Sequence, residues 1–145
     1  MILLPNSQVI DQFLRHIFQA EYEQAFQLCA DNVDFIIFRT AINNQFPIYG
    51  THTEKSAGIQ LFKNLAELFE FGDFKIEDSV IDKNYVIKFG SLAHTVRRTG
   101  KVFNSLWTMI VRFDEEGNIC LYRMREDTAA LEAAMQDDNF LPTKD

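Results

Sequence analysis

The hydrophobic positions between Lys101 and Glu126 alternate in the manner of a β-hairpin. Two runs rich in aromatic and β-branched residues, 101–113 and 119–126, flank the polar segment Asp-Glu-Glu-Gly-Asn. Apolar runs on either side of a short glycine-containing turn are typical of paired antiparallel strands. A bulge at Gly117 would move the second strand by one residue, so the pattern leaves open which of its faces points inward.

The first third of the chain has the spacing of two helices and a strand. Apolar side chains recur at helical intervals over 7–18, where Ser7 is expected as the N-cap, and again over 21–30. A β-branched run predicts a strand over 33–39. The segment 41–49, which contains two asparagines and a proline, is expected to form a loop over one end of the core.

A third helix is expected to start at Thr51 and to end at Gly72, because apolar residues again recur at helical spacing. Thr51 and Glu54 have the spacing of a capping box, in which each side chain accepts a hydrogen bond from a free backbone N–H of the first turn. A fourth helix is expected over 128–135, with Asp127 as its N-cap.

Short turns connect most of the predicted strands. Strands are expected over 75–81 and 85–97, with a bulge or sharp bend at Gly90, and they lead directly into the hairpin. Consecutive strands with short connections form an antiparallel, strongly twisted sheet. Because helices cluster before most of the sheet, the pattern predicts the α+β class and a single domain over 1–145, with 136–145 as a loose tail.

The strand over 101–113 is apolar on both faces, which bears on assembly. Its two faces carry, respectively, Phe103, Trp107, Met109, Val111 and Phe113, and Val102, Leu106, Thr108 and Ile110. A sheet with two apolar faces needs a cover on each of them. The helices would cover one face. We expect a second copy of the chain to cover the other, which predicts a homodimer through the outer sheet face.

Composition and charge restrict the compartment and the partners. The 145 residues are 47% hydrophobic and include 14 phenylalanines, so a single large core is feasible. The net charge of −7 disfavours nucleic acid and anionic membrane surfaces, because both require a basic protein surface. No apolar run could span a bilayer and the apolar N-terminus is too short for a signal peptide, which predicts a cytoplasmic protein. Cys29 and Cys120 are expected to be buried free thiols.

Four segments, taken together in their order and spacing, resemble a known superfamily. They are Phe-Gln-Leu-Cys-Ala-Asp-Asn-Val at 26–33, Tyr-Gly-Thr-His at 49–52, the late hairpin over 107–119, and Arg-Glu-Asp at 125–127. The chain is similar to the nuclear transport factor 2-like (NTF2-like) superfamily, and within it to SnoaL-like polyketide cyclases and ketosteroid isomerases. The resemblance implies a strongly curved, mixed but mostly antiparallel sheet wrapped around the N-terminal helices. It also implies a conical cavity that binds or transforms a small apolar molecule.

Apolar residues occupy the positions that carry the catalytic groups of ketosteroid isomerase. Similarity to that enzyme would place a general-base aspartate at Ile37, an oxyanion-hole tyrosine at Phe13 and a protonated aspartate at Met109. An apolar side chain can neither accept nor donate a proton. The chain therefore lacks the residues for steroid isomerisation by that mechanism.

The resemblance also implies which side chains line the cavity. Those expected to contact the ligand are Phe13, Ile37, Leu92, Val96, Trp107, Met109 and Met124. Four further residues on the same inner surface carry groups for catalysis, namely His94, Ser105, Tyr122 and Glu126. Composition supports this face of the last strand, because the other face carries Arg123 and Arg125, which are costly to bury unpaired.

His94 is the sharpest candidate among these residues. An imidazole titrates near neutral pH and can act as a general acid or base, and a carboxylate at Glu126 would orient the ring and stabilise its cation. Both residues also have a structural interpretation. His94 would then be a core histidine bonded to a neighbouring hydroxyl or carbonyl group, and Glu126 would cap the last helix alongside Asp127.

Two functional hypotheses follow from these residues. In the first, the chain is a cofactor-free isomerase, cyclase or dehydratase of a small apolar carbonyl compound, in which His94 moves the proton and Tyr122 or Ser105 holds the oxygen. In the second, it is a non-catalytic binding module or dimeric scaffold. The sequence has no metal-ligand spacing, glycine-rich phosphate loop or nucleophile motif, so neither hypothesis includes a metal or a cofactor.

Overall fold

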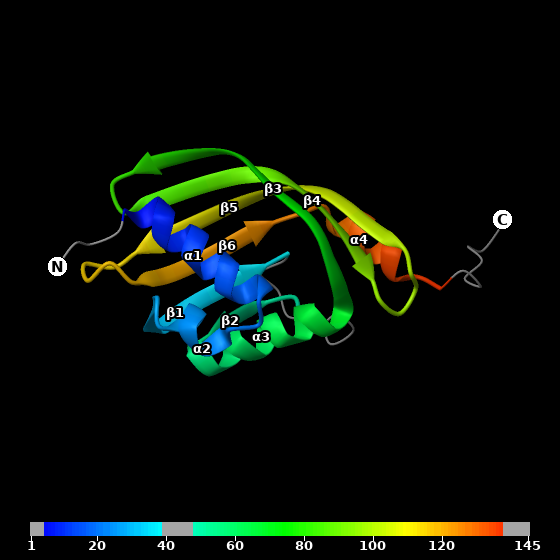
Figure 1. Ribbon diagram of the computed structural model, residues 1–145, viewed down its shortest axis with the longest axis horizontal. Helices are drawn as coiled ribbons and strands as arrows, with labels where there is room; N and C mark the ends of the chain where they lie inside the picture. The colour runs from blue at the N-terminus through cyan, green and yellow to red at the C-terminus, as the bar shows by residue number, and fades with distance from the viewer. Residues whose placement is uncertain (1–4, 39–47, 138–145) are drawn as a thin grey trace.

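The computed structural model describes residues 5–38 and 48–137 (Figure 1). Its elements, in chain order, are α1 (Asn6–Phe18), α2 (Tyr22–Phe26), β1 (Cys29–Ile37), β2 (Thr51–Thr53), α3 (Lys55–Leu68), β3 (Phe69–Asp82), β4 (Tyr85–Val96), β5 (Val102–Phe113), β6 (Ile119–Arg125) and α4 (Thr128–Met135). Strand β2 is additional to the elements predicted from the sequence. Most of the loop expected over 41–49 lies outside the described residues.

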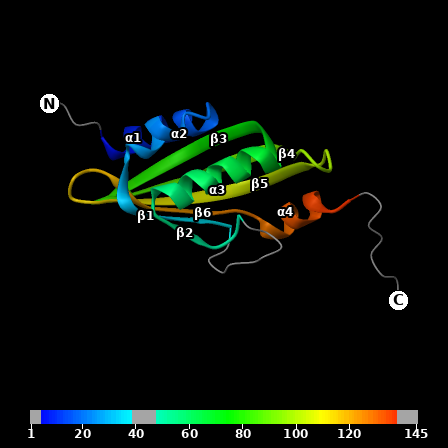
Figure 2. The same cartoon turned by 90° about the horizontal axis from the view of Figure 1, so that it is seen from below.

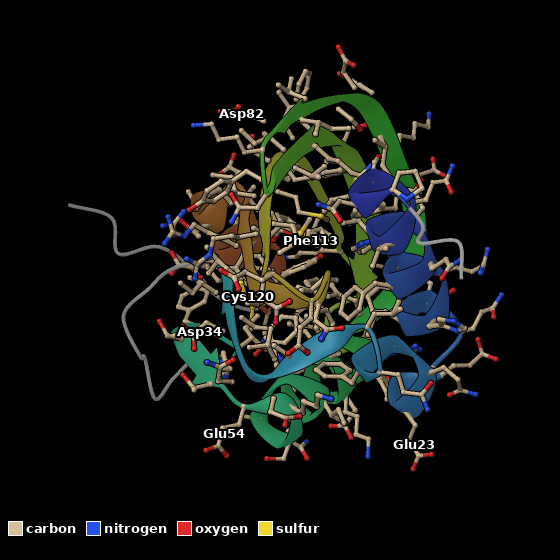
Figure 3. All side chains as sticks on the ribbon, turned by 90° about the vertical axis from the view of Figure 1, so that its left-hand side faces the viewer. Glu23, Asp34, Glu54, Asp82, Phe113 and Cys120 are labelled. Carbon is tan, nitrogen blue, oxygen red and sulfur yellow. The ribbon has the colours of Figure 1, made fainter. Side chains whose placement is uncertain are left out.

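The strands form one sheet in the order β2-β1-β6-β5-β4-β3. β1 and β6 run parallel and the other neighbouring pairs are antiparallel, which confirms a mixed but mostly antiparallel sheet. The sheet curls over α1, α2 and α3, and α4 follows β6 at one end (Figures 1 and 2). Figure 3 shows Phe113 pointing into the interior of this curl, whereas Glu23, Glu54 and Asp82 lie at its periphery. The expected α+β fold class is confirmed.

The register of the β5–β6 hairpin decides which face of β6 points inward. Tyr122 and Met124 lie opposite Val111 and Met109, and all four side chains are buried. The ladder shifts by one residue at the turn end of β6, where Cys120 has no partner on β5. The sequence left open whether a bulge near Gly117 shifts the last strand. The structure has this bulge at Cys120, and the resulting register places Tyr122 and Met124 on the inner face.

The second helix is shorter than expected. α2 ends at Phe26, and Cys29 begins β1 instead of belonging to the helix. The polar pair Asp31 and Asn32 lies inside β1, exposed, in the stretch where the pairing of β1 with β6 shifts register. Cys29 is a buried free thiol as expected, whereas Cys120 is free but only half-buried, because it lies at the hairpin irregularity.

The third helix is shorter than expected at both ends. Thr51 belongs to the strand β2, which pairs with β1, so the expected capping box is absent. Glu54 precedes the helix with a φ of 77° and its side chain makes no cap. At the other end Phe69 already begins β3, and Gly72 lies within that strand rather than at a helix terminus. Pairing with a distant strand outweighs the local capping preference here.

Of the N-caps predicted for the first and last helices, only that of the last helix is present in the structure. α1 begins at Asn6, and Ser7 does not cap it, because its hydroxyl accepts a hydrogen bond from Lys88 Nζ at 2.8 Å. Asp127 caps α4 as expected and accepts a hydrogen bond from the backbone N–H of Ala130 at 3.0 Å. Helix α4 thus begins at a local signal, whereas the side chain of Ser7, expected to cap α1, contacts the sheet instead.

The start of the expected C-terminal tail is held by the turn between β4 and β5. Lys101 Nζ donates a hydrogen bond to the backbone oxygen of Gln136 at 2.7 Å, and Arg98 forms an ion pair with Asp137. Gln136 and Asp137, the first two residues of that segment, are thereby attached to the turn. The remainder of the expected tail, 138–145, lies outside the described residues.

Strand β3 carries two irregularities opposite β4. One lies between Ile76 and Asp78, opposite Gly90, where the sequence predicts a bulge or bend. The extra residue belongs to β3, and Gly90 permits a close approach, since a Cβ there would lie 1.8 Å from the backbone oxygen of Lys75. The second irregularity lies between Glu70 and Asp73 and shapes the candidate site.

Candidate functional site

A small apolar cavity lies between the curled sheet and helices α1 and α3. Its volume is about 60 Å³, which is room for a few water molecules. Its walls are formed by Leu14, Ile17, Phe18, Ile37, Phe38, Phe62, Leu65, Phe69, Phe71, Phe74, Leu92, His94, Phe103, Tyr122, Met124 and Glu126. Only three of these lining residues carry polar side-chain groups, so any chemistry in the cavity depends on His94, Tyr122 and Glu126.

The structure brings part of the expected site together. The expected residues that line the cavity are His94, Tyr122, Glu126, Ile37, Leu92 and Met124. Those that are buried around it without lining it are Phe13, Val96, Ser105, Trp107 and Met109. The hydroxyl of Ser105 is engaged by the backbone: it accepts from the N–H of Asp127 at 2.9 Å and donates to the oxygen of Leu106 at 2.6 Å. Ser105 thus ties β5 to the start of α4.

Glu126 places a carboxyl group in the apolar cavity without a partner. Its Oε2 atom is buried, and no residue in the described ranges forms a hydrogen bond or ion pair with the carboxyl group. Burial raises the pKa of Glu126 to about 8, since removal from water disfavours the charged form. At neutral pH the group is mostly a neutral acid, and above pH 8 it is mostly a carboxylate base.

A backbone hydrogen bond fixes the tautomer of His94. The N–H of Gly72 donates to the imidazole Nδ1 at 3.0 Å, which assigns the lone pair to Nδ1 and the proton of the neutral ring to Nε2. Burial lowers the pKa of His94, and the backbone of Ala93 opposes this shift in part. Protonation would also turn an Nδ1–H against the N–H of Gly72. His94 is therefore suited to donate a neutral hydrogen bond rather than to accept a proton.

The irregularity in β3 explains how Gly72 reaches His94. Between Glu70 and Asp73, β3 has one residue more than the facing stretch of β4. A bulge of this kind removes a backbone group from the ladder, and the N–H of Gly72 bonds to the imidazole instead. Glycine is required at this position, because a Cβ would lie 2.3 Å from the backbone oxygen of Ala93.

Aromatic rings surround the imidazole of His94. The ring centroids of Phe18, Phe69, Phe71 and Phe74 lie between 5.1 and 6.5 Å from its own. These rings desolvate the imidazole and so favour its neutral form. Two of them, Phe18 and Phe71, pack edge-on against the imidazole, and the ring of Phe74 is nearly parallel to it.

Tyr122 connects the cavity with the main aromatic core. Its ring packs against Phe35 and Phe62 at centroid distances of 5.4 and 5.9 Å. Its hydroxyl lies 3.7 Å from the Sδ atom of Met124, which is a weak acceptor. Burial, and to a smaller degree the nearby Glu126, raise the pKa of Tyr122. The phenol therefore stays neutral and keeps a proton for a ligand oxygen.

Two features of the site were not found from the sequence. Phe38 follows β1 with a φ of 67°, a rare left-handed backbone for a bulky residue, and its side chain lines the cavity. Its backbone oxygen accepts a hydrogen bond from Arg125 at 3.2 Å, which helps to hold this conformation. The second feature is the role of Gly72 as a donor to His94. Both depend on residues distant in the sequence, so no local pattern signals them.

No protein-family model and no curated protein matches the chain. Solved structures do match. An NTF2-like protein from Burkholderia xenovorans LB400 has a TM-score of 0.79 at 21% identity, covering 90% of this chain and 95% of that one. A proposed isomerase from Rhodopseudomonas palustris has a TM-score of 0.77 at 16% identity, with 92% and 97% covered. IdmH, a proposed polyketide cyclase from Streptomyces antibioticus, has 0.71 at 15% identity, with 91% and 99% covered.

These likenesses show that the chain has the NTF2-like fold, and they confirm the resemblance inferred from the sequence at the level of the fold. At such identities the fold carries no site residues with it, so the function must be argued from the cavity itself. Within the described ranges, no helix is both long and apolar enough to cross a bilayer.

Proposed function

We propose that the protein is a cofactor-free enzyme that transfers a proton within a small apolar carbonyl compound, as an isomerase, cyclase or dehydratase. The observation that carries this proposal is the carboxyl group of Glu126, whose Oε2 atom is buried and which has no partner among the described residues. Burial of an unpaired polar group costs stability, and such costs are concentrated at functional sites. A pKa of about 8 keeps both protonation states of Glu126 accessible near neutral pH.

Glu126 is the proton carrier in this proposal. Its carboxylate takes a proton from the carbon next to the substrate carbonyl, and the resulting acid returns the proton to another carbon or to a leaving hydroxyl group. The Nε2–H of His94 and the hydroxyl of Tyr122 donate hydrogen bonds to the carbonyl oxygen, which becomes negative as the proton leaves. This assignment differs from the one expected from the sequence, in which His94 moved the proton, because Gly72 occupies Nδ1.

The apolar walls suit a flat or aliphatic substrate. Ile37, Leu92 and Met124 line the cavity, so they are the proposed ligand contacts, while Trp107 and the other buried residues around it support these walls. One similar structure is described as a proposed isomerase and another as a proposed polyketide cyclase, which agrees with this class of reaction.

Deuterium exchange at the carbon next to a ketone tests the proposal. With 2-tetralone in D₂O, followed by proton NMR, the wild type is expected to accelerate exchange, and Glu126→Gln should reduce the enzymatic rate by about 100-fold or more. Glu116→Gln, in the exposed β5–β6 turn, is the matched control and should exchange at the wild-type rate. If Glu126→Gln exchanges as fast as the wild type, Glu126 is not the proton carrier.

The small size of the cavity, about 60 Å³, favours a second candidate function, a non-catalytic binding module. The same ketone separates the two candidates. If 2-tetralone changes the fluorescence of Trp107 but its exchange is not accelerated, the protein binds ligands of this class without catalysis. Acceleration that disappears in Glu126→Gln would exclude a purely binding role.

We also propose that the protein forms a homodimer through the outer face of β3, β4 and β5. Leu106 is 75% exposed there, and Val102 and Val80 are 53% and 51% exposed, which leaves an apolar surface open to a second copy. Leu106→Glu is expected to convert the dimer to a monomer in sedimentation experiments, and a monomeric wild type at micromolar concentration would contradict the proposal. A cytoplasmic location stays a prediction from the sequence.

A further inference from the structure

An open groove lies beside the cavity, and we infer that the two form one binding site for an elongated substrate. The groove runs between α1 and β3, which lie side by side in Figure 2, and has a volume of about 590 Å³. Four side chains border both hollows: Leu14, Phe18, Phe71 and Phe74. The inference rests on the proposed function, because it places the reacting carbonyl end in the cavity and the remainder of the substrate in the groove.

The sizes of the two hollows support this division. The cavity, at about 60 Å³, can hold only the end of a substrate. Sites for small molecules typically measure roughly 300–1,000 Å³, a range that the groove reaches and the cavity does not. The groove alone is an open surface feature without acid–base groups from the cavity. Binding and chemistry therefore require both parts.

Three phenylalanine rings divide the groove from the cavity. The centroid of Phe18 lies 5.2 Å from that of Phe71 and 5.2 Å from that of Phe74. Phe18 is the last residue of α1 and is 38% exposed, so it is the least constrained of the three. In the proposed site, rotation of its side chain to another staggered conformation would join the two hollows.

The groove carries one uncompensated positive charge in a chain of net charge −7. Its charged lining residues are Asp11 and Arg15. Asp11 is neutralised by Lys88, whose Nζ lies 3.3 Å from Asp11 Oδ1. Arg15 forms no ion pair with any residue in the described ranges. Asp11 lies one helical turn before Arg15, but it is already paired with Lys88. The guanidinium group of Arg15 is therefore free to bind an anion.

The position of Arg15 defines the chemical class of the substrate. Arg15 precedes Phe18 by three residues, which is about 5 Å along the helix axis, on the groove side of the phenylalanine divider. A guanidinium group pairs well with a carboxylate through two parallel hydrogen bonds. The substrate class is therefore an elongated apolar compound with a ketone or aldehyde at one end and a carboxylate at the other.

A matched pair of probes tests this inference: 6-acetyl-2-naphthoate, which has a ketone and a carboxylate at opposite ends, and its uncharged methyl ester. Trp107 is the single tryptophan of the chain and stacks on Phe74 at 4.6 Å, so quenching of its fluorescence reports binding at the divider. The wild type is expected to bind the acid more tightly than the ester. Arg15→Gln should weaken binding of the acid about fivefold and leave the ester unchanged.

Lys83→Gln is the control, since it removes the same charge from an exposed position in the turn between β3 and β4, outside both hollows. It should change neither affinity. Failure of the wild type to bind the acid, or equal effects of Arg15→Gln on acid and ester, would overturn the inference. The test needs no turnover, so it is independent of proton transfer. If Arg15→Gln weakens binding of the acid but not of the ester, while Glu126→Gln exchanges protons at the wild-type rate, the proposed function is wrong and the inferred binding role of the groove is retained.

Discussion

Lys88 and Glu126 both lie on the inner face of the sheet, and the structure treats them in opposite ways. Lys88 is 3% exposed, and its Nζ lies 2.8 Å from Ser7 Oγ, 3.0 Å from Ser79 Oγ and 3.3 Å from Asp11 Oδ1. Glu126 is a half-buried residue whose Oε2 atom is buried at the cavity, and its carboxyl group has no partner within the described residues.

The difference separates a structural group from a functional candidate. An ammonium group has three hydrogens to donate, and three oxygen atoms lie close enough to Lys88 Nζ to accept them. Lys88 therefore connects α1 to β3 and β4. Glu126 ties nothing together, and its burial is a cost to the fold. A buried ionisable group that stabilises nothing is the better candidate for chemistry.

The largest expected effect is the pH dependence of stability caused by Glu126. Its pKa is raised from 4.5 to about 8, so its contribution to stability is present below pH 4.5 and is lost as the pH rises through 8. Between pH 6 and pH 9 this loss is on the order of 3 kcal/mol. Glu126→Gln should remove it, and the difference in unfolding free energy between the variant and the wild type, from urea denaturation, should grow over this range.

Glu116→Gln, in the exposed turn, serves as the control and should follow the wild type at every pH. If Glu126→Gln keeps the full pH dependence of the wild type, the carboxyl group is not the buried group described here, and the contrast with Lys88 disappears.

A smaller effect is expected at Lys88. Lys88→Met keeps much of the side-chain length but removes the donors to Ser7 and Ser79, so the free energy of unfolding should fall by about 1–2 kcal/mol. Lys75→Met, at an exposed position on β3, should have little effect on stability. Proton exchange by Lys88→Met should equal that of the wild type, because the residue is structural. If Lys88→Met loses proton exchange but keeps its stability, Lys88 is a functional residue and not a structural one.

The smallest effect concerns the protonation of His94. Because its pKa is lowered, the contribution of its neutral ring to stability is present above pH 6.5 and is lost as the pH falls below that value. Nitrogen NMR shifts at pH 7 are expected to show an unprotonated Nδ1 and a protonated Nε2. Observation of the Nδ1–H tautomer would mean that Gly72 does not donate to the ring, and His94 would then regain the role of a base.

The elements that hydrophobic spacing predicted well are those whose limits depend on neighbouring residues. Asp127 caps α4, the hairpin of β5 and β6 forms around its glycine-containing turn, and Leu92 and Met124 point inward as expected. Prediction was wrong where a distant partner decides the outcome. Thr51 pairs with β1 instead of capping a helix.

The sequence by itself determined the α+β class and the alternation of apolar and polar side chains along the long strands, whereas the inward face of the last strand, left open by the turn, was decided by the register of the β5–β6 hairpin. Side-chain alternation is a local consequence of strand geometry. Only the tertiary structure decided the chemical states of His94 and Glu126. The tautomer of His94 depends on a bulge that brings Gly72 beside it, and the raised pKa of Glu126 depends on an apolar enclosure. Hydrogen-bond partners and desolvation are set by residues far apart in the chain, so no local pattern records them.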